Sequence, residues 1–321
     1  MAHAAAFRIR MGVLFGLLAI GVMTTDPGRS ESLLSEDLPL GLPVSDLLRL
    51  MLAVGLVSLA GRQISVVKRV RLEQAEVARV RQEMAFARGT QERFLPQLLP
   101  VVPGLDLWGA NVSSLEVSGD YYDIRDGGDA HPLLLAIADV SGKGFPAALL
   151  MSAVQAGLHS YLLEDGFDLE RTMQNLNRLV HQDAETGRFV TMFLAEFDKQ
   201  TGRLRYVRAG HDLPLIISRD GSVQRLSEGD VFLGLYPHVE YHAATIDLSP
   251  GDTLCLYTDG VTEAADPRGE MFDEERLVQV LVRHRAEPAA TIGRSILEAV
   301  SAHSGLLRQT DDATLVILKI A

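Results

Sequence analysis

Aspartates that end or begin apolar, strand-like segments are the most informative residues of this chain. They occur in four short motifs, S-G-D-Y-Y-D (118–123), A-D-V-S-G-K-G (138–144), Y-T-D-G-V-T-E (257–263) and T-D-D-A-T (310–314). Aspartates at strand ends can converge on one point, and converging carboxylates repel one another unless cations lie among them. Mg²⁺ and Mn²⁺ prefer such oxygen ligands. The motifs therefore predict a site for hard divalent metal ions.

The placement of the acids is the same in each motif. Asp139 ends an apolar run before S-G-K-G turns the chain toward a predicted helix, and Asp259 follows L-C-L-Y-T in the same way. Asp120 begins a strand-like segment, and Asp311 and Asp312 precede one. One such acid alone is more often a turn residue or a helix cap. Four with one placement favour a shared site.

Other catalytic chemistries find less support. His211 and Ser141 lie in glycine-containing turns, but no G-x-S-x-G elbow is present, so a Ser/His/Asp triad is disfavoured. We expect His211 to order a loop near the acids. Cys255 is the only cysteine and lies in the apolar run T-L-C-L-Y, which is typical of a core residue. The chain also has no G-x-G-x-x-G or P-loop phosphate cradle.

The order of predicted elements indicates an α+β domain. Strand patterns precede, separate and follow helix patterns, and D-K-Q-T-G at 198–202 is typical of a hairpin turn, so a layered fold is favoured over a parallel doubly wound sheet. The predicted strands are 105–112, 119–125, 133–140, 190–198, 204–209, 213–218, 253–258 and 313–320. The predicted helices are 146–163, 168–184, 274–285 and 288–303.

Charge is distributed unevenly between the first hundred residues and the remainder. Residues 1–99 contain 12 Lys and Arg against 9 Asp and Glu, whereas residues 100–321 contain 18 against 33. The acidic part would repel nucleic acid backbones, so no nucleic-acid partner is expected. It would also repel a phosphorylated substrate unless metal ions inverted the local field.

Residues 1–62 predict a membrane anchor of two helices. Apolar runs at 11–23 and 50–60 are each shorter than the roughly 20 residues of a spanning helix and reach that length only with their flanks. Basic residues mark both outer flanks and acidic residues the segment between them, which predicts a hairpin with both termini in the cytoplasm. A signal peptide and a buried helical pair are the alternatives.

Residues 63–100 predict a coiled-coil linker. Apolar residues from Val66 to Leu98 recur in alternating steps of four and three, interrupted by Glu73 and Gln91. Pro96 and Pro100 should end the helix. We expect a parallel homodimer through this segment, the alternative being one amphipathic helix packed on its own domain.

Residues from about 85 onward resemble the SpoIIE/RsbU-like branch of the metal-dependent (PPM) serine/threonine protein phosphatases. The similarity covers F-L-P-Q-L-L-P, S-G-D-Y-Y-D, A-D-V-S-G-K-G-F-P-A-A-L, R-F-V-T-M-F, T-G-R-L-R-Y-V-R-A-G-H, L-S-P-G-D-T-L-C-L-Y-T-D-G-V-T-E-A and D-D-A-T-L-V-I-L, in that order. For residues 101–321 it implies an α-β-β-α sandwich of two antiparallel sheets flanked by helices. It also implies hydrolysis of phosphoserine or phosphothreonine with two divalent cations, Mn²⁺ or Mg²⁺, on a phosphorylated protein such as an anti-sigma-factor antagonist.

The resemblance also implies roles for single residues. Asp139 resembles the acid that bridges two metal ions, with the Val140 carbonyl beside it, and Asp120 resembles the acid on the outer metal. Asp259 and Asp311 resemble the acids that complete the other metal site, with Asp312 as the alternative to Asp311. Lys143 is the candidate for contacting the phosphoryl group.

Two functions from different classes remain open on the sequence. The first is a phosphatase at the cell membrane, with its catalytic domain in the cytoplasm and its activity set through the linker. The second is a catalytically inactive phosphatase fold that binds a phosphoprotein partner as an adaptor. Retention of every acidic position favours the first, because a binding surface has no need of mutually repelling carboxylates.

Overall fold

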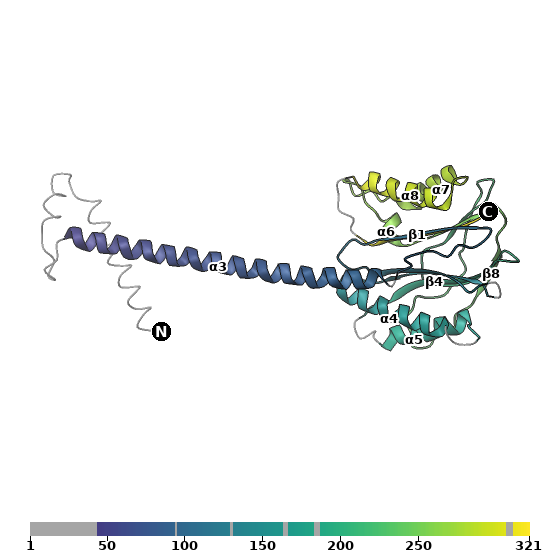
Figure 1. Cartoon of the computed structure of the whole chain (residues 1–321), viewed down its shortest axis with the longest axis horizontal. Coiled ribbons are helices and arrows are strands. Elements are labelled where there is room, and N and C mark those ends of the chain that lie inside the picture. Colours follow the sequence, from purple (N-terminus) through teal and green to yellow (C-terminus); the bar gives the residue numbers. More distant parts are fainter. Residues whose placement is uncertain (1–43, 94, 129–130, 163–165, 183–186, 306–310) are drawn as a thin grey trace. The chain divides into compact units, whose positions relative to one another are not determined.

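A computed structural model describes residues 44–93, 95–128, 131–162, 166–182, 187–305 and 311–321 (Figure 1). The chain divides into two compact units, Met1–Arg79 and Val80–Ala321. The apolar run at 11–23 and the predicted loop of the hairpin up to residue 43 lie outside the described residues.

The first described element is one long helix, α3 (Val44–Glu92). Within it, Met51–Gln91 is the one stretch of the described residues that is long and apolar enough to cross a membrane by length and composition. Its apolar side chains are exposed, Leu52 to 69% and Val57 to 73%. The helix continues without a break through residue 62, where the sequence predicts a boundary, and it ends before Pro96 as expected.

Two antiparallel five-stranded sheets form the centre of the second unit. One has the order β1-β10-β9-β6-β7, and the other has the order β2-β3-β4-β5-β8. The strands of the first are β1 (Leu105–Val112), β10 (Ala313–Ile320), β9 (Thr253–Tyr257), β6 (Leu215–Ile217) and β7 (Val223–Arg225). Those of the second are β2 (Asp120–Asp126), β3 (Leu133–Val140), β4 (Val190–Asp198), β5 (Arg203–Ala209) and β8 (Ala244–Asp247).

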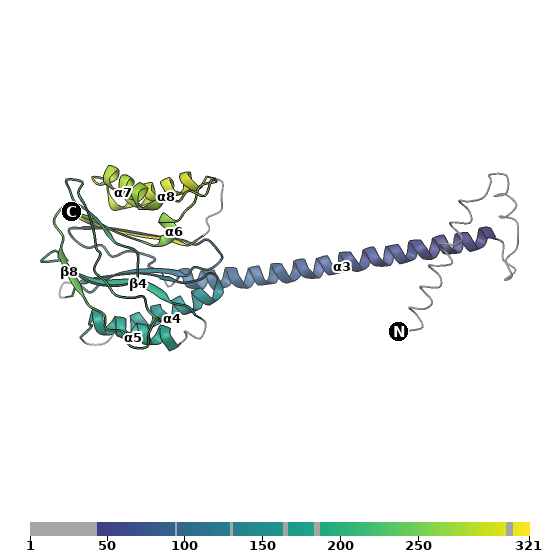
Figure 2. The same ribbon diagram turned by 180° about the vertical axis from the view of Figure 1, so that it is seen from behind.

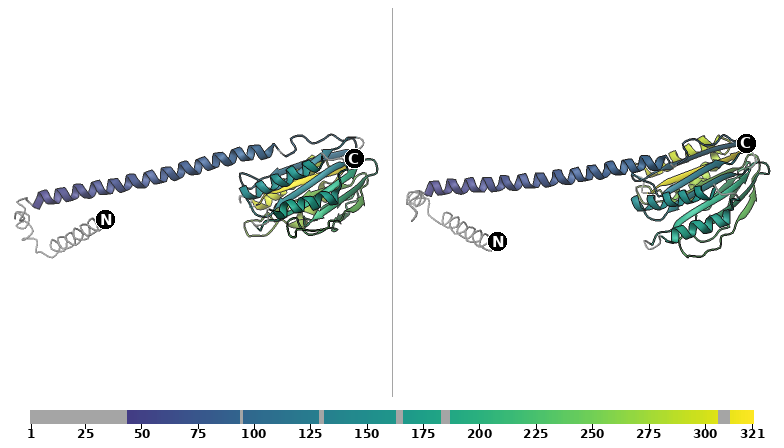
Figure 3. Two further views of the ribbon diagram at one scale, coloured as in Figure 1. Left: turned by 90° about the horizontal axis from the view of Figure 1, so that it is seen from below. Right: turned by 60° about the horizontal axis from the view of Figure 1, so that its bottom comes forward.

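Helices cover the outer face of each sheet. Helices α4 (Phe145–Leu162) and α5 (Leu169–Gln182) lie against the second sheet, and α7 (Asp273–His284) and α8 (Ala289–Ser304) lie against the first (Figures 1 and 2). The short helix α6 (Asp259–Thr262) follows β9 directly. The view from below shows α4 and α5 covering the face of the sheet (Figure 3). The predicted sandwich of two antiparallel sheets between helices is therefore confirmed.

Burial on both faces explains why the central strands are so apolar. In β3, Leu133, Leu135 and Ile137 belong to the core between the two sheets. The alternate residues Leu134, Ala136 and Ala138 belong to the core under α4 and α5. Successive side chains of a strand point to opposite faces, so a strand covered on both sides reads as a continuous apolar run.

Most predicted elements are present, and the differences concern short or exposed ones. Strands β7 and β8, which the sequence analysis does not predict, are three and four residues long and half exposed at sheet edges. The strand predicted at 213–218 is shortened to Leu215–Ile217. The hairpin turn at 198–202 is confirmed, with the Gly202 N–H donating to the Asp198 carbonyl over 2.9 Å.

Candidate active site

Strand register brings the first two predicted acids together. Strands β2 and β3 are antiparallel, with Asp120 directly opposite Asp139. Asp139 has the same parity as Ile137, whose side chain lies between the sheets. Both carboxylates therefore lie on the inner face of the second sheet, at the end where β2 begins and β3 finishes.

The other sheet supplies the remaining acids from two neighbouring strand ends. Strand β10 pairs with β9, with Leu315 opposite Tyr257, and the Thr258 N–H donates to the Thr314 carbonyl over 3.1 Å. Asp259 follows β9, and Asp311 and Asp312 precede β10. Because the strands are antiparallel, the end of one lies beside the beginning of the other. The two motifs that are most distant from S-G-D-Y-Y-D in sequence thus meet.

Asp120 joins the two sheets. Its Oδ2 accepts hydrogen bonds from Thr258 Oγ1 at 2.8 Å and from Thr314 Oγ1 at 2.7 Å. The residue is buried, and burial together with the neighbouring charge of Asp139 raises its pKa well above the ordinary value. Asp120 is therefore held from both sheets rather than projecting into solvent.

The acids in this region raise one another's pKa. Burial, followed by the charges of Asp259 and Asp311, raises the pKa of Asp139 to about 7. Burial, followed by the charge of Asp311, raises the pKa of Asp259 to about 6. Burial disfavours the charged form of each carboxyl, and the neighbouring negative charges raise its pKa further. Asp120, Asp139, Asp259 and Asp311 are hereafter called the acid cluster.

The two adjacent aspartates of T-D-D-A-T have different surroundings. Asp312 is buried, and its Oδ1 accepts from the Ser114 N–H at 2.7 Å and from Ser114 Oγ at 3.0 Å, while its Oδ2 accepts from the Gly119 N–H at 2.7 Å. Asp311 keeps 34% of its side chain exposed and acts on the pKa of both Asp139 and Asp259. The structure thus places Asp311 in the acid cluster and Asp312 against the backbone of the 114–119 segment.

Lys143, the candidate for contacting the phosphoryl group, lies at the edge of the acid cluster. Its Nζ is 2.6 Å from Asp311 Oδ2, and nearly half of its side chain is exposed. The glycines on either side of it, Gly142 and Gly144, have φ values of +91° and +77°, which favour glycine and allow the tight turn after β3. Val140, whose carbonyl is the remaining predicted ligand, is buried one residue after Asp139.

Two further acids belong to this region and were not assigned from the sequence. Burial, followed by the charges of Asp259 and Glu263, raises the pKa of Asp212 to about 6. Glu263 closes the short helix α6 and is exposed. The available signal for Asp212 was its position just after the strand β5, which is the placement of the other acids. Glu263 carried no comparable signal, because its approach to Asp259 depends on one turn of helix.

His211 is buried next to these acids. Its Nδ1 lies 3.0 Å from Thr191 Oγ1, and Arg208 Nη1 donates to its carbonyl over 2.7 Å. Burial and the charge of Arg208 lower the pKa of His211 to about 3. An imidazole with so low a pKa is a weak base, so the geometry favours a role in ordering the loop over a role in a triad.

Gly260 allows the closest approach within the site. A Cβ at this position would lie 1.9 Å from the Asp312 carbonyl oxygen, which is far inside contact distance. The backbone after β9 therefore packs directly on the backbone before β10. Only glycine fits here without moving one of the two strand ends.

The donor set of the acid cluster suits Mg²⁺ or Mn²⁺. Carboxylate oxygens are the preferred ligands of these ions, and added positive charge would relieve both the burial cost and the repulsion that raise the pKa of Asp139 and Asp259. Across the described ranges, no three His, Cys, Asp or Glu side chains form a closed group around a single point. Mg²⁺ keeps several water ligands and uses only one or two carboxylates at many sites, so an open cluster is compatible with it.

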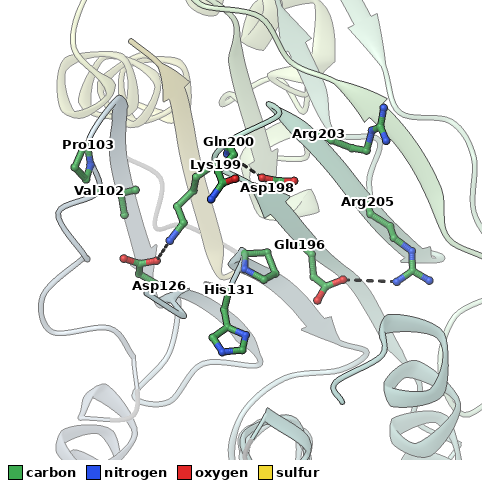
Figure 4. A pocket seen from close by; sticks show the side chains of 11 residues that line it. Val102, Pro103, Asp126, His131, Glu196, Asp198, Lys199, Gln200, Arg203 and Arg205 are labelled. Atoms are coloured by element: carbon green, nitrogen blue, oxygen red, sulfur yellow. Dashed lines mark hydrogen bonds and ion pairs between the residues drawn. The ribbon is translucent and has the colours of Figure 1, made fainter. Parts of the chain in front are cut away.

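A cavity in the second sheet lies away from the acid cluster. It has a volume of about 630 Å³ and is lined by residues at the opposite end of the second sheet (Figure 4). Asp126 and Lys199 form an ion pair on its lining, as do Glu196 and Arg205 (Figure 4). None of the predicted site residues lines this cavity, so it is separate from the acid cluster.

The fold is that of PP2C-type phosphatase domains. The SiaA-PP2C domain of Pseudomonas aeruginosa has the same fold, with a TM-score of 0.68 at 21% identity over 76% of this chain and 98% of that one. The PP2C phosphatase domain of SpoIIE from Bacillus subtilis, solved with a fragment of its regulatory domain, gives a TM-score of 0.59 at 21% identity. That likeness covers 67% of this chain and 63% of the other.

Sequence similarity then assigns the family. Residues 129–321 match the family model described as Stage II sporulation protein E (SpoIIE). The phosphoserine phosphatase RsbU of Bacillus subtilis (strain 168) is 30% identical over 241 residues, which are 75% of this chain and 70% of that protein. The chain belongs to the SpoIIE family of serine/threonine protein phosphatases.

Proposed function

We propose that this chain is a membrane-tethered, metal-dependent phosphatase that dephosphorylates serine or threonine on a regulatory protein in bacterial signal transduction. A phosphorylated anti-sigma-factor antagonist is the proposed substrate. The observation that carries the proposal is the acid cluster, in which both sheets contribute carboxylates that raise one another's pKa. A fold retained only for binding would gain nothing from that repulsion.

We assign the metal ligands as follows. On the family resemblance, Asp139 and the Val140 carbonyl would serve both cations, Asp120 would serve the outer cation, and Asp259 and Asp311 would serve the other. We leave Asp312 out of the ligand set, because its two carboxylate oxygens already accept three hydrogen bonds from the 114–119 segment. When bound, two such cations would lower the pKa of a water molecule and neutralise charge on the phosphoryl oxygens.

The chain's own residues position the reacting groups. Thr258 and Thr314 fix the Asp120 carboxylate, and Gly260 lets the backbone after Asp259 pack against the Asp312 backbone. A substrate held against these acids reaches a site whose loops are ordered before it binds, which lowers the entropic cost of the reaction. The acids themselves are too negative to hold a phosphate, so positive charge at the rim is needed.

Two basic side chains at the rim are candidates for contacting the phosphoryl group. Lys143 lies against Asp311. Arg188 approaches the same loop, its Nε 3.8 Å from the position a Cβ on Gly142 would occupy, and it forms no ion pair or side-chain hydrogen bond within the described residues. A guanidinium binds phosphate in a bidentate manner, whereas an ammonium acts as a point charge.

Single substitutions separate these two candidates. If Arg188 contacts the phosphoryl group, Arg188→Ala should raise KM for a phosphoprotein by about tenfold, the value of one charge-assisted hydrogen bond. Lys143→Ala should then change KM less, because its ammonium is engaged with Asp311. The reverse order of effects would assign the contact to Lys143.

The experiment that tests the proposed activity uses the full chain purified in detergent. Release of phosphate from a phosphorylated anti-sigma-factor antagonist is measured with Mn²⁺, with Mg²⁺ and with excess chelator. We expect turnover with metal and none with chelator. Stable binding of the phosphoprotein without turnover under every metal condition would instead support the inactive adaptor.

We propose further that residues 1–62 anchor the chain as a helical hairpin, with the phosphatase domain in the cytoplasm. The support is the charge bias of the two apolar runs and the exposed apolar side chains of α3 from Met51 onward. Membranes from expressing cells would be washed with alkaline carbonate. Release of the protein into the wash would contradict the anchor.

The linker at 63–100 is proposed to form a parallel coiled-coil homodimer. The support is the seam itself, since Val66, Val70 and Val77 are 58%, 44% and 51% exposed in the single chain. Polar residues at seam positions weaken a coiled coil while fixing its register. Glu73→Leu should therefore strengthen dimerisation in sedimentation equilibrium and change the basal phosphatase rate, whereas no change in mass or rate would contradict the dimer.

A further inference from the structure

The Gln91 side chain, in the last turn of α3, bonds to the backbone of the phosphatase domain. The Gln91 amide makes two hydrogen bonds with the backbone of Ser118: its Nε2 donates to the Ser118 carbonyl over 2.7 Å, and its Oε1 accepts from the Ser118 N–H over 2.9 Å. Gln91 is half-buried and Ser118 is buried. Donor and acceptor of one amide thus occupy both backbone groups of one residue, which fixes its position and orientation together.

Ser118 is in turn bonded to the acid cluster. Its Oγ accepts from the Asp120 N–H at 3.1 Å and from Asn111 Nδ2 at 3.1 Å. The same Asn111 nitrogen donates to Thr314 Oγ1 over 2.8 Å, and that hydroxyl donates to the Asp120 carboxylate over 2.7 Å. Two short routes of hydrogen bonds therefore connect the Gln91 amide to Asp120.

The next residue extends the connection to the first sheet and to β3. The Gly119 N–H donates to Asp312 Oδ2 over 2.7 Å, and the Gly119 carbonyl accepts from the Val140 N–H over 3.3 Å. The segment 113–119, between β1 and β2, has no strand or helix of its own. Its position depends on these side-chain and loop hydrogen bonds, of which the Gln91 pair is the contribution of the helix.

We infer that Gln91 is a positioning residue that couples the end of α3 to the acid cluster through Ser118. Gln91 contacts no acid of the cluster itself. It holds the loop that presents Asp120 and that supplies the Gly119 N–H to Asp312. Movement of the last turn of α3 is thereby converted into movement of the phosphatase site.

The same residue has a second possible environment, which makes the coupling adjustable. Gln91 continues the seam of α3 after Val80, Met84 and Ala87, and a coiled coil extended to this point would draw its amide into the helix interface. The amide cannot serve the interface and Ser118 at once. Gly89, two residues earlier, lowers the helix stability of this turn and has no neighbouring atom within 4 Å of where a Cβ would lie.

The test compares Gln91→Met, which keeps the size and removes both hydrogen bonds, with Gln97→Met as the matched control. Gln97 makes an exposed local bond to the Leu95 carbonyl, outside the connection to Ser118. Amide hydrogen exchange of residues 118–120 is measured on the metal-free, full-length chain in detergent. Because the loss of two neutral hydrogen bonds corresponds to about a tenfold change or more, we expect exchange there to accelerate by roughly tenfold in Gln91→Met and not in the control.

Kinetics on the same proteins test whether the coupling reaches the site, and this arm rests on the proposed function. With a small phosphate ester and saturating Mn²⁺, kcat should fall by about tenfold while KM stays constant, because Gln91 does not touch substrate. The Mn²⁺ concentration needed for half-maximal activity should rise. Gln91→Glu keeps the bond from the Ser118 N–H and should restore part of the protection and part of kcat.

The outcomes separate the inference from the proposed function. Normal exchange at 118–120 in both Gln91 variants, with normal kcat, would overturn the inference. If the parent protein shows no turnover with any metal, the proposed function fails, while the exchange data still decide whether Gln91 holds the loop. Should Gln91→Met not fold, the same two measurements on Gln91→Glu decide the question.

Discussion

The two ends of the sheet that contains β2, β3 and β4 treat acidic side chains in opposite ways. At the far end, the Lys199 ammonium lies 2.5 Å from Asp126 and holds the pKa of that carboxyl below its ordinary value. At the near end, Asp120 lies opposite Asp139 and the pKa values of both are raised. Strand β2 thus carries Asp126, which is paired with a cation, and Asp120, which lies opposite another acid, only six residues apart.

The difference lies in the partners that the chain supplies. Arg205 lies beside Glu170, Glu196 and Asp168 at the far end, although burial still raises the pKa of Glu196. Around the acid cluster, Lys143 is paired with Asp311, while Asp139, Asp259 and Asp212 repel one another. A folded protein that keeps such repulsion has reserved the place for external positive charge. At the far end the chain supplies the positive charge that its acids need, whereas at the near end bound cations must supply it.

Neutralising one acid at each end of the sheet should give the largest difference between the two ends. Asp139→Asn removes a charge from the proposed bridging position and should reduce phosphatase turnover at least about a hundredfold, since even partners of metal ligands cost 10–100-fold. Asp126→Asn, at the far end, is the matched control and should leave turnover unchanged. The measurement is kcat with saturating Mn²⁺, together with bound metal content. An Asp139→Asn protein with normal turnover and metal content would remove this residue from the centre of the site.

The neighbouring acids Asp311 and Asp312 sharpen the comparison within the near end. Asp312→Ala deprives Ser114 and Gly119 of their buried acceptor and should lower the free energy of unfolding by on the order of 3 kcal/mol. Asp311→Ala should change stability little, because Asp311 is partly exposed, yet it should abolish turnover. Thermal unfolding and kcat of both variants distinguish the two roles. Equal loss of stability in both would show that the different hydrogen-bond partners do not matter.

The pH dependence of stability should differ between the two ends in the metal-free protein. The pKa of Asp139 is raised from 3.8 to about 7, so between roughly pH 4 and pH 7 the unfolded chain loses this proton while the folded chain keeps it. Stability should therefore fall as pH rises through this window and level off above it. Melting temperatures in chelator should show a shallower fall for Asp139→Asn than for the parent. Parallel curves for the two proteins would argue against the raised pKa.

The smallest effect is expected where neither end is involved. Cys255 is fully buried in the middle of β9, and burial alone raises its thiol pKa far above the ordinary value, so the thiolate that covalent chemistry requires is not formed. Cys255→Ser should leave turnover intact and lower stability by about 1–3 kcal/mol for a buried hydroxyl without a partner. A folded serine variant without activity would point to thiol chemistry instead.

Periodicity and strand-end placement predicted most of the fold and the location of the acids. The continuous apolar run of β3 predicted both the strand and the position of Asp139 at its end. Asp168 begins the predicted helix 168–184, and its Oδ1 accepts from the Arg171 N–H over 2.8 Å at the start of α5, as the side chain of an N-cap residue does. These features depend on local sequence, which is why they could be read without the structure.

Features that depend on contacts between distant segments could not be read in this way. The sequence left Asp311 and Asp312 as alternatives, because what separates them is the hydrogen bonding of Asp312 to Ser114 and Gly119, nearly 200 residues earlier in the chain. From the sequence, Gln91 was only a polar interruption of the heptad seam, because its hydrogen bond to Ser118 depends on a segment 27 residues later. Strand β8 has the sequence A-T-I-D, whose alternation of apolar and polar residues is too short to predict a strand. It is an edge strand defined by its pairing with β5.

The glycine after Asp259 has a consequence for how finely this site can be adjusted. A Cβ at residue 260 would lie only 1.9 Å from the Asp312 carbonyl oxygen. The two strand ends can therefore be this close only because residue 260 has no side chain. The size of the side chain at residue 260 therefore determines how closely the two strand ends can approach. Each added atom there, from alanine to serine to valine, would wedge Asp259 away from Asp311 by a graded amount. A series of such side chains would turn the separation of two acids into a variable that an experimenter can choose, without altering the charge of either one.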